Sequence, residues 1–237
     1  MCTLILDWKP RSLLLLGNRD ERLDRPAQGW ALRTSARGTR FLAPLDLAAG
    51  GTWVGVNQHG LVVALTNHHT GSPPDPARAS RGILVQQMFD HSSASAARDD
   101  VLCRRARDYN PFHLVVADAT SAFLWHSSPT ADAPEDLAPG LHVVTESHAH
   151  GVGDRGASIR QRFHPSMTAS EAHSLLALHA EDPRAAVCVH LGDTYGTRSS
   201  LMLALEPGRG TLFVTDQRPC LTPWTDATAL LNQLLSA

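Results

Sequence analysis

Cys2 is the residue whose type and position point most directly to chemistry. It follows the initiator methionine and precedes an apolar run at residues 4–6. Cytosolic aminopeptidases remove an initiator methionine when a small residue such as cysteine follows, so we expect Cys2 to become N-terminal. Its thiol has a reference pKa of about 8.5, and the α-amine on the same residue has one of about 7.7–8.0. A single residue would then supply a nucleophile and the base that activates it.

A charged string, Asn18-Arg19-Asp20-Glu21, follows a second apolar run at residues 13–16. The two runs, joined by a Lys-Pro turn, predict a hairpin that returns this string to the side of Cys2. A guanidinium there would favour the thiolate. On a strand, Arg19 and Glu21 share one face and Asn18 and Asp20 share the other. Only one of the two carboxylates can then face the Cys2 amine, and we favour Asp20 over Glu21.

A plainer interpretation is a cysteine at a frayed terminus and a charged turn in solvent. Three features favour chemistry instead. An apolar run follows Cys2 directly, the charged string closes the neighbouring run, and a Gly-Gly-Thr-Trp block at residues 50–53 lies at a distance suited to the next hairpin.

Composition bounds the function classes. The chain has 237 residues, 43% hydrophobic and 19% charged, with a formal net charge of -2. This balance predicts a globular protein and implies no nucleic-acid partner. No apolar stretch approaches the length of a transmembrane helix and no signal peptide is present, so we expect no stable membrane insertion and a cytoplasmic location. Lys9 is the single lysine beside many arginines, which we interpret as codon usage of a GC-rich bacterial genome.

The elements that must position these residues read mainly as strand pairs. Hairpins are predicted over residues 50–67 and 112–125, strands at 140–145, 185–190, 199–205 and 211–215, and helices at 81–89, 92–107, 168–179 and 226–235. Residues 22–44 read as a long loop with one short strand. Helices in blocks between hairpins favour an α+β fold with antiparallel sheets, and no linker divides residues 1–237, which predicts one domain.

Several short blocks together resemble one family. They are Met1-Cys2-Thr3, Asn18-Arg19-Asp20-Glu21, Arg25-Pro26, Gly50-Gly51-Thr52-Trp53-Val54-Gly55, Ala64-Leu65-Thr66-Asn67 and Tyr195-Gly196-Thr197-Arg198. In this order they resemble the NRDE family, also called the transport-and-Golgi-organisation proteins. The resemblance implies an N-terminal-nucleophile hydrolase fold, a four-layer αββα sandwich of two stacked antiparallel sheets. Within this fold, the chain is similar to the branch that contains penicillin V acylase and the bile-salt hydrolases.

The resemblance also implies a site. Cys2 matches the nucleophile, Arg19 the arginine near it, Asn67 an asparagine that binds the oxyanion, and Arg198 a late arginine of the acylase sites. From the residues alone, Asn67 is equally a turn former at a strand end, and Arg198 a surface residue beside a glycine turn. We assign Cys2, Arg19, Asp20, Asn67 and Arg198 to catalysis.

Three further residues, Asn18, Glu21 and Glu146, are assigned to substrate binding. The chain departs from the acylase pattern at two of the sites. The acylases have Arg-x-x-Asp, whereas Asp20 and Glu21 follow Arg19 directly. Glu146 stands where the acylases carry a second oxyanion-binding asparagine. Loss of one oxyanion donor typically lowers the catalytic rate ~10²–10³-fold, so a glutamate at this position counts against amide hydrolysis.

Metal binding is not expected. The pairs His68-His69 and His148/His150 show no zinc spacing, and with 13 histidines chance clusters are common. The four cysteines, at positions 2, 103, 188 and 220, are widely spread and show no CxxC spacing, which argues against a disulfide framework or a structural zinc site. We therefore expect neither a metal nor a cofactor.

The sequence thus favours hydrolysis of a linear amide or thioester through Cys2, with a small molecule carrying an acyl group as substrate. The alternative is a non-catalytic carrier that holds an acyl-CoA, a lipid or haem in the same cleft.

Overall fold

The computed structural model describes residues 2–127 and 133–236. Met1, whose removal the sequence predicts, lies outside them. The strands are β1 (Thr3–Lys9), β2 (Ser12–Arg22), β3 (Ala27–Thr34), β4 (Arg40–Asp46), β5 (Val54–Asn57), β6 (Val62–Asn67), β7 (Phe112–Ala117), β8 (Ala122–His126), β9 (Glu135–Asp136), β10 (Gly140–Thr145), β11 (His190–Leu191), β12 (Tyr195–Glu206), β13 (Arg209–Thr215) and β14 (Thr225–Asp226). The helices are α1 (Arg81–Met88), α2 (Ala94–Leu102), the 3-10 turn η1 (Ala106–Asp108), α3 (Asp154–Arg162), α4 (Ala169–Leu176) and α5 (Thr228–Leu235).

Two antiparallel sheets form the centre of the molecule. Sheet A has the order β10-β1-β2-β12-β13-β14, with β11 paired to β12, and sheet B has the order β3-β4-β5-β6-β7-β8-β9. Leucines and valines that alternate along β1, β2, β12 and β13 meet those of β4 to β8 in one core between the sheets. Because every second side chain of a strand points to the same face, this core takes one face of each sheet.

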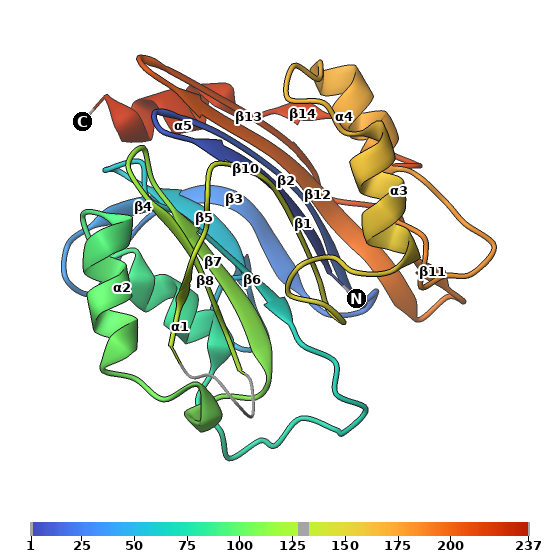
Figure 1. Ribbon diagram of the computed structural model, residues 1–237, viewed down its shortest axis with the longest axis horizontal. Helices are drawn as coiled ribbons and strands as arrows, with labels where there is room; N and C mark the ends of the chain where they lie inside the picture. Colours follow the sequence, from blue (N-terminus) through green and yellow to red (C-terminus); the bar gives the residue numbers. More distant parts are fainter. Residues whose placement is uncertain (1, 128–132, 237) are drawn as a thin grey trace.

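The outer faces of the sheets are covered by helices, as Figure 1 shows. The buried residues of α1 and α2 pack against β6, β7 and β8 on sheet B. Those of α3 and α4 pack against β1, β2 and β10 on sheet A. Helix α5 closes one end of the sandwich, where Leu231 and Leu234 enter the core between the sheets. The α+β fold with four αββα layers that the sequence predicts is confirmed.

Most predicted elements are present. Helix α4 lies within the helix predicted at residues 168–179 and begins at a capping box, in which the Thr168 hydroxyl accepts a hydrogen bond from the Glu171 backbone and the Glu171 carboxylate accepts one from the Thr168 backbone. The predicted hairpins correspond to β1/β2, β5/β6 and β7/β8.

The structure differs from the sequence-based prediction in three places. Residues 22–44, expected as a long loop with one short strand, contain β3 and most of β4. β3 is a half-exposed edge strand, so its sequence lacks the strong apolar alternation of a buried strand. Helix α3 was missed because it is mostly polar, and only Arg155, Gly156 and Ile159 are buried. Residues 185–190 were expected as a strand, but of these only His190, together with Leu191, pairs with β12.

Within the described part of the chain, no helix combines the length and the apolar character needed to cross a bilayer.

Candidate active site

The first hairpin positions Cys2. The register of β1 with β2 pairs Thr3 with Asn18, so Cys2 lies at the end of β1 beside Arg19. The Cys2 Sγ lies 3.7 Å from the carbonyl oxygen of Asp20. The Cys2 carbonyl accepts a hydrogen bond of 3.2 Å from the backbone N–H of Glu146, which follows β10 on the other side. Neighbouring strands on both sides therefore hold the backbone of this residue.

Cys2 opens into a cavity of about 710 Å³, which we call the Cys2 cavity. Its wall includes Arg19, Asp20, Glu21 and Asn67. A second cavity of about 890 Å³ shares Asn67 with it and is lined by Glu146 and Tyr195 as well. The structure thus brings Cys2 and four of the predicted site residues into one cavity wall and places Glu146 in the neighbouring one.

Burial governs the thiol. It raises the pKa of the Cys2 thiol, while a backbone hydrogen bond at Asp20 and the charge of Arg19 act weakly in the opposite direction. Arg19 thus acts in the direction expected from the sequence, toward the thiolate, but burial outweighs its effect. A protonated thiol needs a base before it can act as a nucleophile.

Arg19 lies on the face of β2 that looks toward sheet B. Its guanidinium lies 4.1 Å from the centroid of the Trp53 ring, 3.7 Å from the Glu21 carboxylate and 3.8 Å from the Asp46 carboxylate. The side chain is only 7% exposed, and burial lowers its pKa, although the carboxylates act against this shift. Two anions and an aromatic face compensate a buried cation, so Arg19 is fixed in place. Glu21 also pairs with Arg25 at 3.7 Å.

Asp20 lies on the opposite face of β2 and is 3% exposed. Its Oδ1 accepts a hydrogen bond of 2.6 Å from the Thr197 hydroxyl. Its Oδ2 is buried and has no hydrogen-bond partner among residues 2–127 and 133–236. Burial raises the pKa of Asp20 to about 7, against the effects of the Thr197 hydrogen bond and nearby positive charge. This carboxyl group can therefore gain or lose a proton near neutral pH.

Asn18 shares the face of Asp20 and lies beneath the helical layer. Its amide donates to the carbonyl oxygens of Leu176 at 2.9 Å and Val187 at 2.8 Å, and accepts from the Ser200 hydroxyl at 2.6 Å. These three bonds tie α4 and the segment before β11 to sheet A. The side chain predicted to bind substrate is therefore engaged within the protein.

Glu146 is buried in an ion pair. Its Oε2 lies 2.9 Å from Nη1 of Arg155 on α3, and its Oε1 accepts a hydrogen bond of 3.2 Å from the Ser147 hydroxyl. Arg155 also donates to the Thr3 hydroxyl at 3.3 Å. The carboxylate that replaces the expected asparagine is thus neutralised. The arginine responsible lies on the helix that the sequence did not reveal.

Arg198 is not brought to Cys2. It follows a register shift between β2 and β12 at Thr197, and its guanidinium donates to the carbonyl oxygen of Leu23. It lines a separate cavity with Asp216 and Arg218, and it does not line the Cys2 cavity.

Two site residues were missed by sequence reasoning. The Tyr195 hydroxyl donates to the Asp20 carbonyl oxygen at 3.1 Å, beside Cys2 Sγ. Burial raises the pKa of Tyr195, and the nearby negative charges act in the same direction. Tyr195 lies in the block that carried the resemblance, in which only Arg198 was singled out. Arg81 lines the Cys2 cavity and donates to the Pro111 carbonyl at 2.8 Å.

A close backbone contact explains how Arg81 reaches the cavity. A Cβ atom at Gly51 would lie 2.5 Å from the Gly82 carbonyl carbon, so only glycine fits there. The Thr52 N–H donates to the Gly82 carbonyl oxygen at 3.2 Å. The start of α1 is therefore packed against the segment that precedes β5 and carries Trp53. No sequence pattern in α1 marked Arg81 as part of a site.

We expect Asp20→Asn to gain stability relative to the wild type as pH rises. The pKa of Asp20 is about 7 in the folded protein and about 3.9 in an unfolded chain. Between these values the native state keeps a proton that the unfolded state has lost. The stability that the protonated Asp20 carboxyl contributes to the wild type is complete below about pH 4 and disappears as pH rises to about 7.

Urea unfolding at about pH 5 and about pH 8 measures this effect. The free energy of unfolding of Asp20→Asn minus that of the wild type should grow by roughly 2–3 kcal/mol over that interval. Asp99→Asn, at an exposed position on α2, is the control and should show no such trend. A constant or shrinking difference for Asp20→Asn would mean that folding does not raise the pKa of the Asp20 carboxyl in the wild type.

The Glu146–Arg155 pair makes a second prediction. Glu146→Gln should lower the free energy of unfolding by about 3–5 kcal/mol, because it leaves the Arg155 guanidinium buried without its counter-charge. The double variant Glu146→Gln/Arg155→Met should recover part of that loss, since no buried charge remains. Denaturant unfolding of the single and double variants gives the coupling energy. Additive effects would show that the two side chains act independently.

Comparison with known proteins agrees with this architecture. The chain resembles penicillin V acylase from Agrobacterium tumefaciens with a TM-score of 0.58 and 15% identity, over 96% of this chain and 86% of that one. It also resembles an N-acylethanolamine-hydrolyzing acid amidase ortholog from Caenorhabditis elegans with a TM-score of 0.59 and 11% identity, over 99% and 97% of the two chains. At these identities the likeness concerns the fold, that of N-terminal-nucleophile hydrolases.

Sequence relatives give the family. A mouse Transport and Golgi organization 2 homolog is 25% identical, over 87% of this chain and 89% of its own. A bovine Transport and Golgi organization protein 2 homolog is 30% identical over 62% of this chain, and the match spans 57% of the bovine protein. The family model described as Transport and Golgi organisation 2 matches residues 1–173. The chain therefore belongs to the Transport and Golgi organisation 2 family.

Proposed function

We propose that this protein is a cytosolic hydrolase that cleaves a linear amide or thioester of a small acyl compound through Cys2. The observation that carries the proposal is the position of Cys2, at the end of a central strand and in the wall of a cavity of about 710 Å³. Support also comes from the fold, because two structural neighbours are named as an acid amidase that hydrolyses N-acylethanolamines and as a conjugated bile acid hydrolase.

The base in this proposal is the amine of Cys2 itself, freed by removal of Met1. A base is needed because burial raises the pKa of the thiol. The reference pKa of an α-amine, about 7.7–8.0, suits a group that accepts and returns a proton near neutral pH. Asp20 Oδ2 is buried without a partner among the described residues and is the acceptor we assign to the resulting ammonium.

The reaction proceeds in two halves. The thiol proton passes to the Cys2 amine, and Sγ attacks the substrate carbonyl carbon while the C=O π electrons move to oxygen. The tetrahedral intermediate collapses, the bond to the leaving nitrogen or sulfur breaks, and that atom takes the proton from the ammonium. Water then attacks the thioester on Cys2 with the amine as base, which releases the carboxylic acid and restores the thiol.

We assign the oxyanion to the Asn67 side chain and to backbone N–H groups. Asn67 ends β6 and lines the Cys2 cavity. Glu146 does not present an unpaired charge to this region, because Arg155 lies 2.9 Å from its carboxylate. The paired Glu146 carboxylate therefore opposes an oxyanion less than a free one would, although Glu146 still supplies no hydrogen-bond donor.

Charges of both signs line the Cys2 cavity. Arg25, Arg78 and Arg81 lie in its wall together with Asp46 and Asp75, while Trp53 and Leu65 are its larger apolar members. We therefore expect a substrate with a polar or charged group in addition to its acyl chain. Arg19 is compensated by two carboxylates and the Trp53 ring, so its role is to position rather than to bind the substrate charge.

A non-catalytic carrier is the alternative, and Glu146 favours it. A carrier of an acyl-CoA, a lipid or haem needs no oxyanion donor, so a glutamate in place of an asparagine costs it nothing. The adjoining cavities of about 710 and 890 Å³ would hold such a ligand in either case.

The test is turnover on a panel of linear acyl amides and acyl thioesters. We expect wild-type protein to release acid from at least one of them and to show an acyl adduct on Cys2 by mass spectrometry of quenched samples. Cys2→Ala should lose turnover by at least ~10³-fold, because no other group replaces the nucleophile. Cys103→Ala is the matched control, since Cys103 is exposed at the end of α2.

Equal turnover in Cys2→Ala and wild type would refute the proposed mechanism. Tight binding of a panel compound by both proteins, with no acid released by either, would establish the carrier instead.

A further inference from the structure

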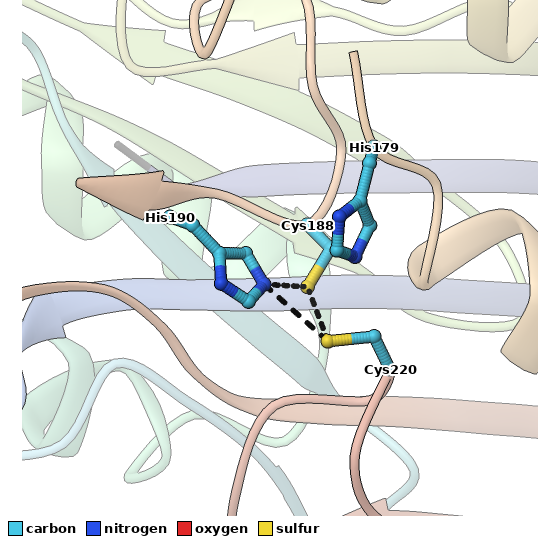
Figure 2. Close-up of side chains that lie close together, drawn as sticks. All are labelled: His179, Cys188, His190 and Cys220. Carbon is cyan, nitrogen blue, oxygen red and sulfur yellow. Dashed lines mark hydrogen bonds between the residues drawn. The ribbon is translucent and has the colours of Figure 1, made fainter. Parts of the chain in front are cut away.

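Four potential metal ligands lie close together beside sheet A. They are His179 after α4, Cys188 just before β11, His190 at the start of β11, and Cys220 in the loop after β13 (Figure 2). One ligand atom from each lies within 4.8 Å of the others. Cys188 Sγ and Cys220 Sγ are 3.6 Å apart, and His190 Nε2 lies 3.6 Å from the first and 3.3 Å from the second.

These distances match the edges of a tetrahedral zinc centre. With Zn–S of about 2.3 Å and Zn–N of about 2.0–2.1 Å, tetrahedral angles place two sulfurs about 3.8 Å apart and sulfur and nitrogen about 3.5 Å apart. The three separations among Cys188, Cys220 and His190 agree with these values within a few tenths of an ångström. His179 completes the set, with its ring centroid 4.7 Å from that of His190. A disulfide, by contrast, needs sulfurs about 2.05 Å apart.

The donor set fits one kind of metal. Two thiolates and two neutral imidazoles suit zinc, and a Cys₂His₂ centre with Zn²⁺ has no net charge. Burial of an uncharged centre avoids the cost of an isolated ion, and Cys188 is buried. Four protein ligands leave no open position, so such a centre is structural.

We propose that His179, Cys188, His190 and Cys220 form a structural zinc site. The ligands come from three places in the chain, of which Cys220 is distant in sequence, so zinc would fasten the loop after β13 to the segment between α4 and β11. The four ligands form no recognisable sequence motif, because Cys220 lies far from the other three and no standard zinc spacing is present. The fold alone assembles the set.

This site would stabilise residues that border the Cys2 cavity. Next to Cys188, the Val189 N–H donates to the Thr197 hydroxyl at 2.8 Å, and that hydroxyl donates to Asp20 at 2.6 Å. On the other side, the Val187 carbonyl accepts a hydrogen bond from Asn18. The zinc site is thus a support of the segment that holds Asp20 and Asn18, and it stands whether or not Cys2 is catalytic.

Elemental analysis of untagged protein purified without chelators is the first test. We expect about one zinc per chain in the wild type, as a closed four-ligand site requires. Cys220→Ser and His190→Ala should lose it, whereas Cys103→Ser, which alters a cysteine outside the cluster, should keep it.

Cobalt gives a second readout that does not depend on the variants folding. Zinc-free wild-type protein titrated with Co²⁺ should develop a thiolate-to-cobalt charge-transfer band and the strong visible absorption of tetrahedral cobalt, and Zn²⁺ should abolish both. Zinc should also protect Cys188 and Cys220 from alkylation and raise the Tm of the zinc-free protein, because it binds the native state.

Wild-type protein that purifies without metal and gives no tetrahedral cobalt spectrum would overturn the proposal. So would a Cys188–Cys220 disulfide in protein purified under reducing conditions, or zinc retained equally by Cys220→Ser.

Discussion

The alternation of side chains along β2 is the constraint on which the site depends. Because β2 is held between β1 and β12, its register is fixed on both edges, and a slip of one residue would exchange its two faces. Arg19 and Glu21 therefore look toward Trp53 and Asp46 on the side of sheet B, and Asn18 and Asp20 look toward the helical layer. These four consecutive polar residues therefore face two different environments in alternation. Cys2 is held at the end of the neighbouring strand β1, close to both.

The second constraint on the site is that buried charges must be compensated. Arg19 has two carboxylates and an aromatic ring, and Glu146 has Arg155. Asp20, by contrast, keeps a buried carboxyl oxygen without a partner among the described residues, and burial raises its pKa. An uncompensated buried carboxyl costs stability, and such groups cluster at functional sites. In the proposed mechanism this oxygen meets the Cys2 ammonium, which would provide the missing charge.

Sequence reasoning recovered the parts of this structure that depend on local patterns. The apolar runs around Cys2 and the charged string predicted the β1/β2 hairpin that returns this string to Cys2, and a helix was predicted where α4 lies. It failed where long-range packing decides. The polar surface of α3 hid both the helix and Arg155, the edge position of β3 hid a strand, and the register shift at Thr197 turned Arg198 away from Cys2. The cluster around Cys188 depends on three segments that only the complete fold brings together.

The central claim is that one residue supplies both nucleophile and base, and this requires Cys2 to carry a free amine. An intact-mass spectrum of the purified protein tests it most directly, because removal of methionine changes the mass of every molecule by a known amount. The account predicts a dominant species that begins at Cys2, or that species carrying an acyl adduct on the thiol. A spectrum in which most molecules retain Met1 would contradict it, since the amine would then lie one residue away from the thiol that it must activate.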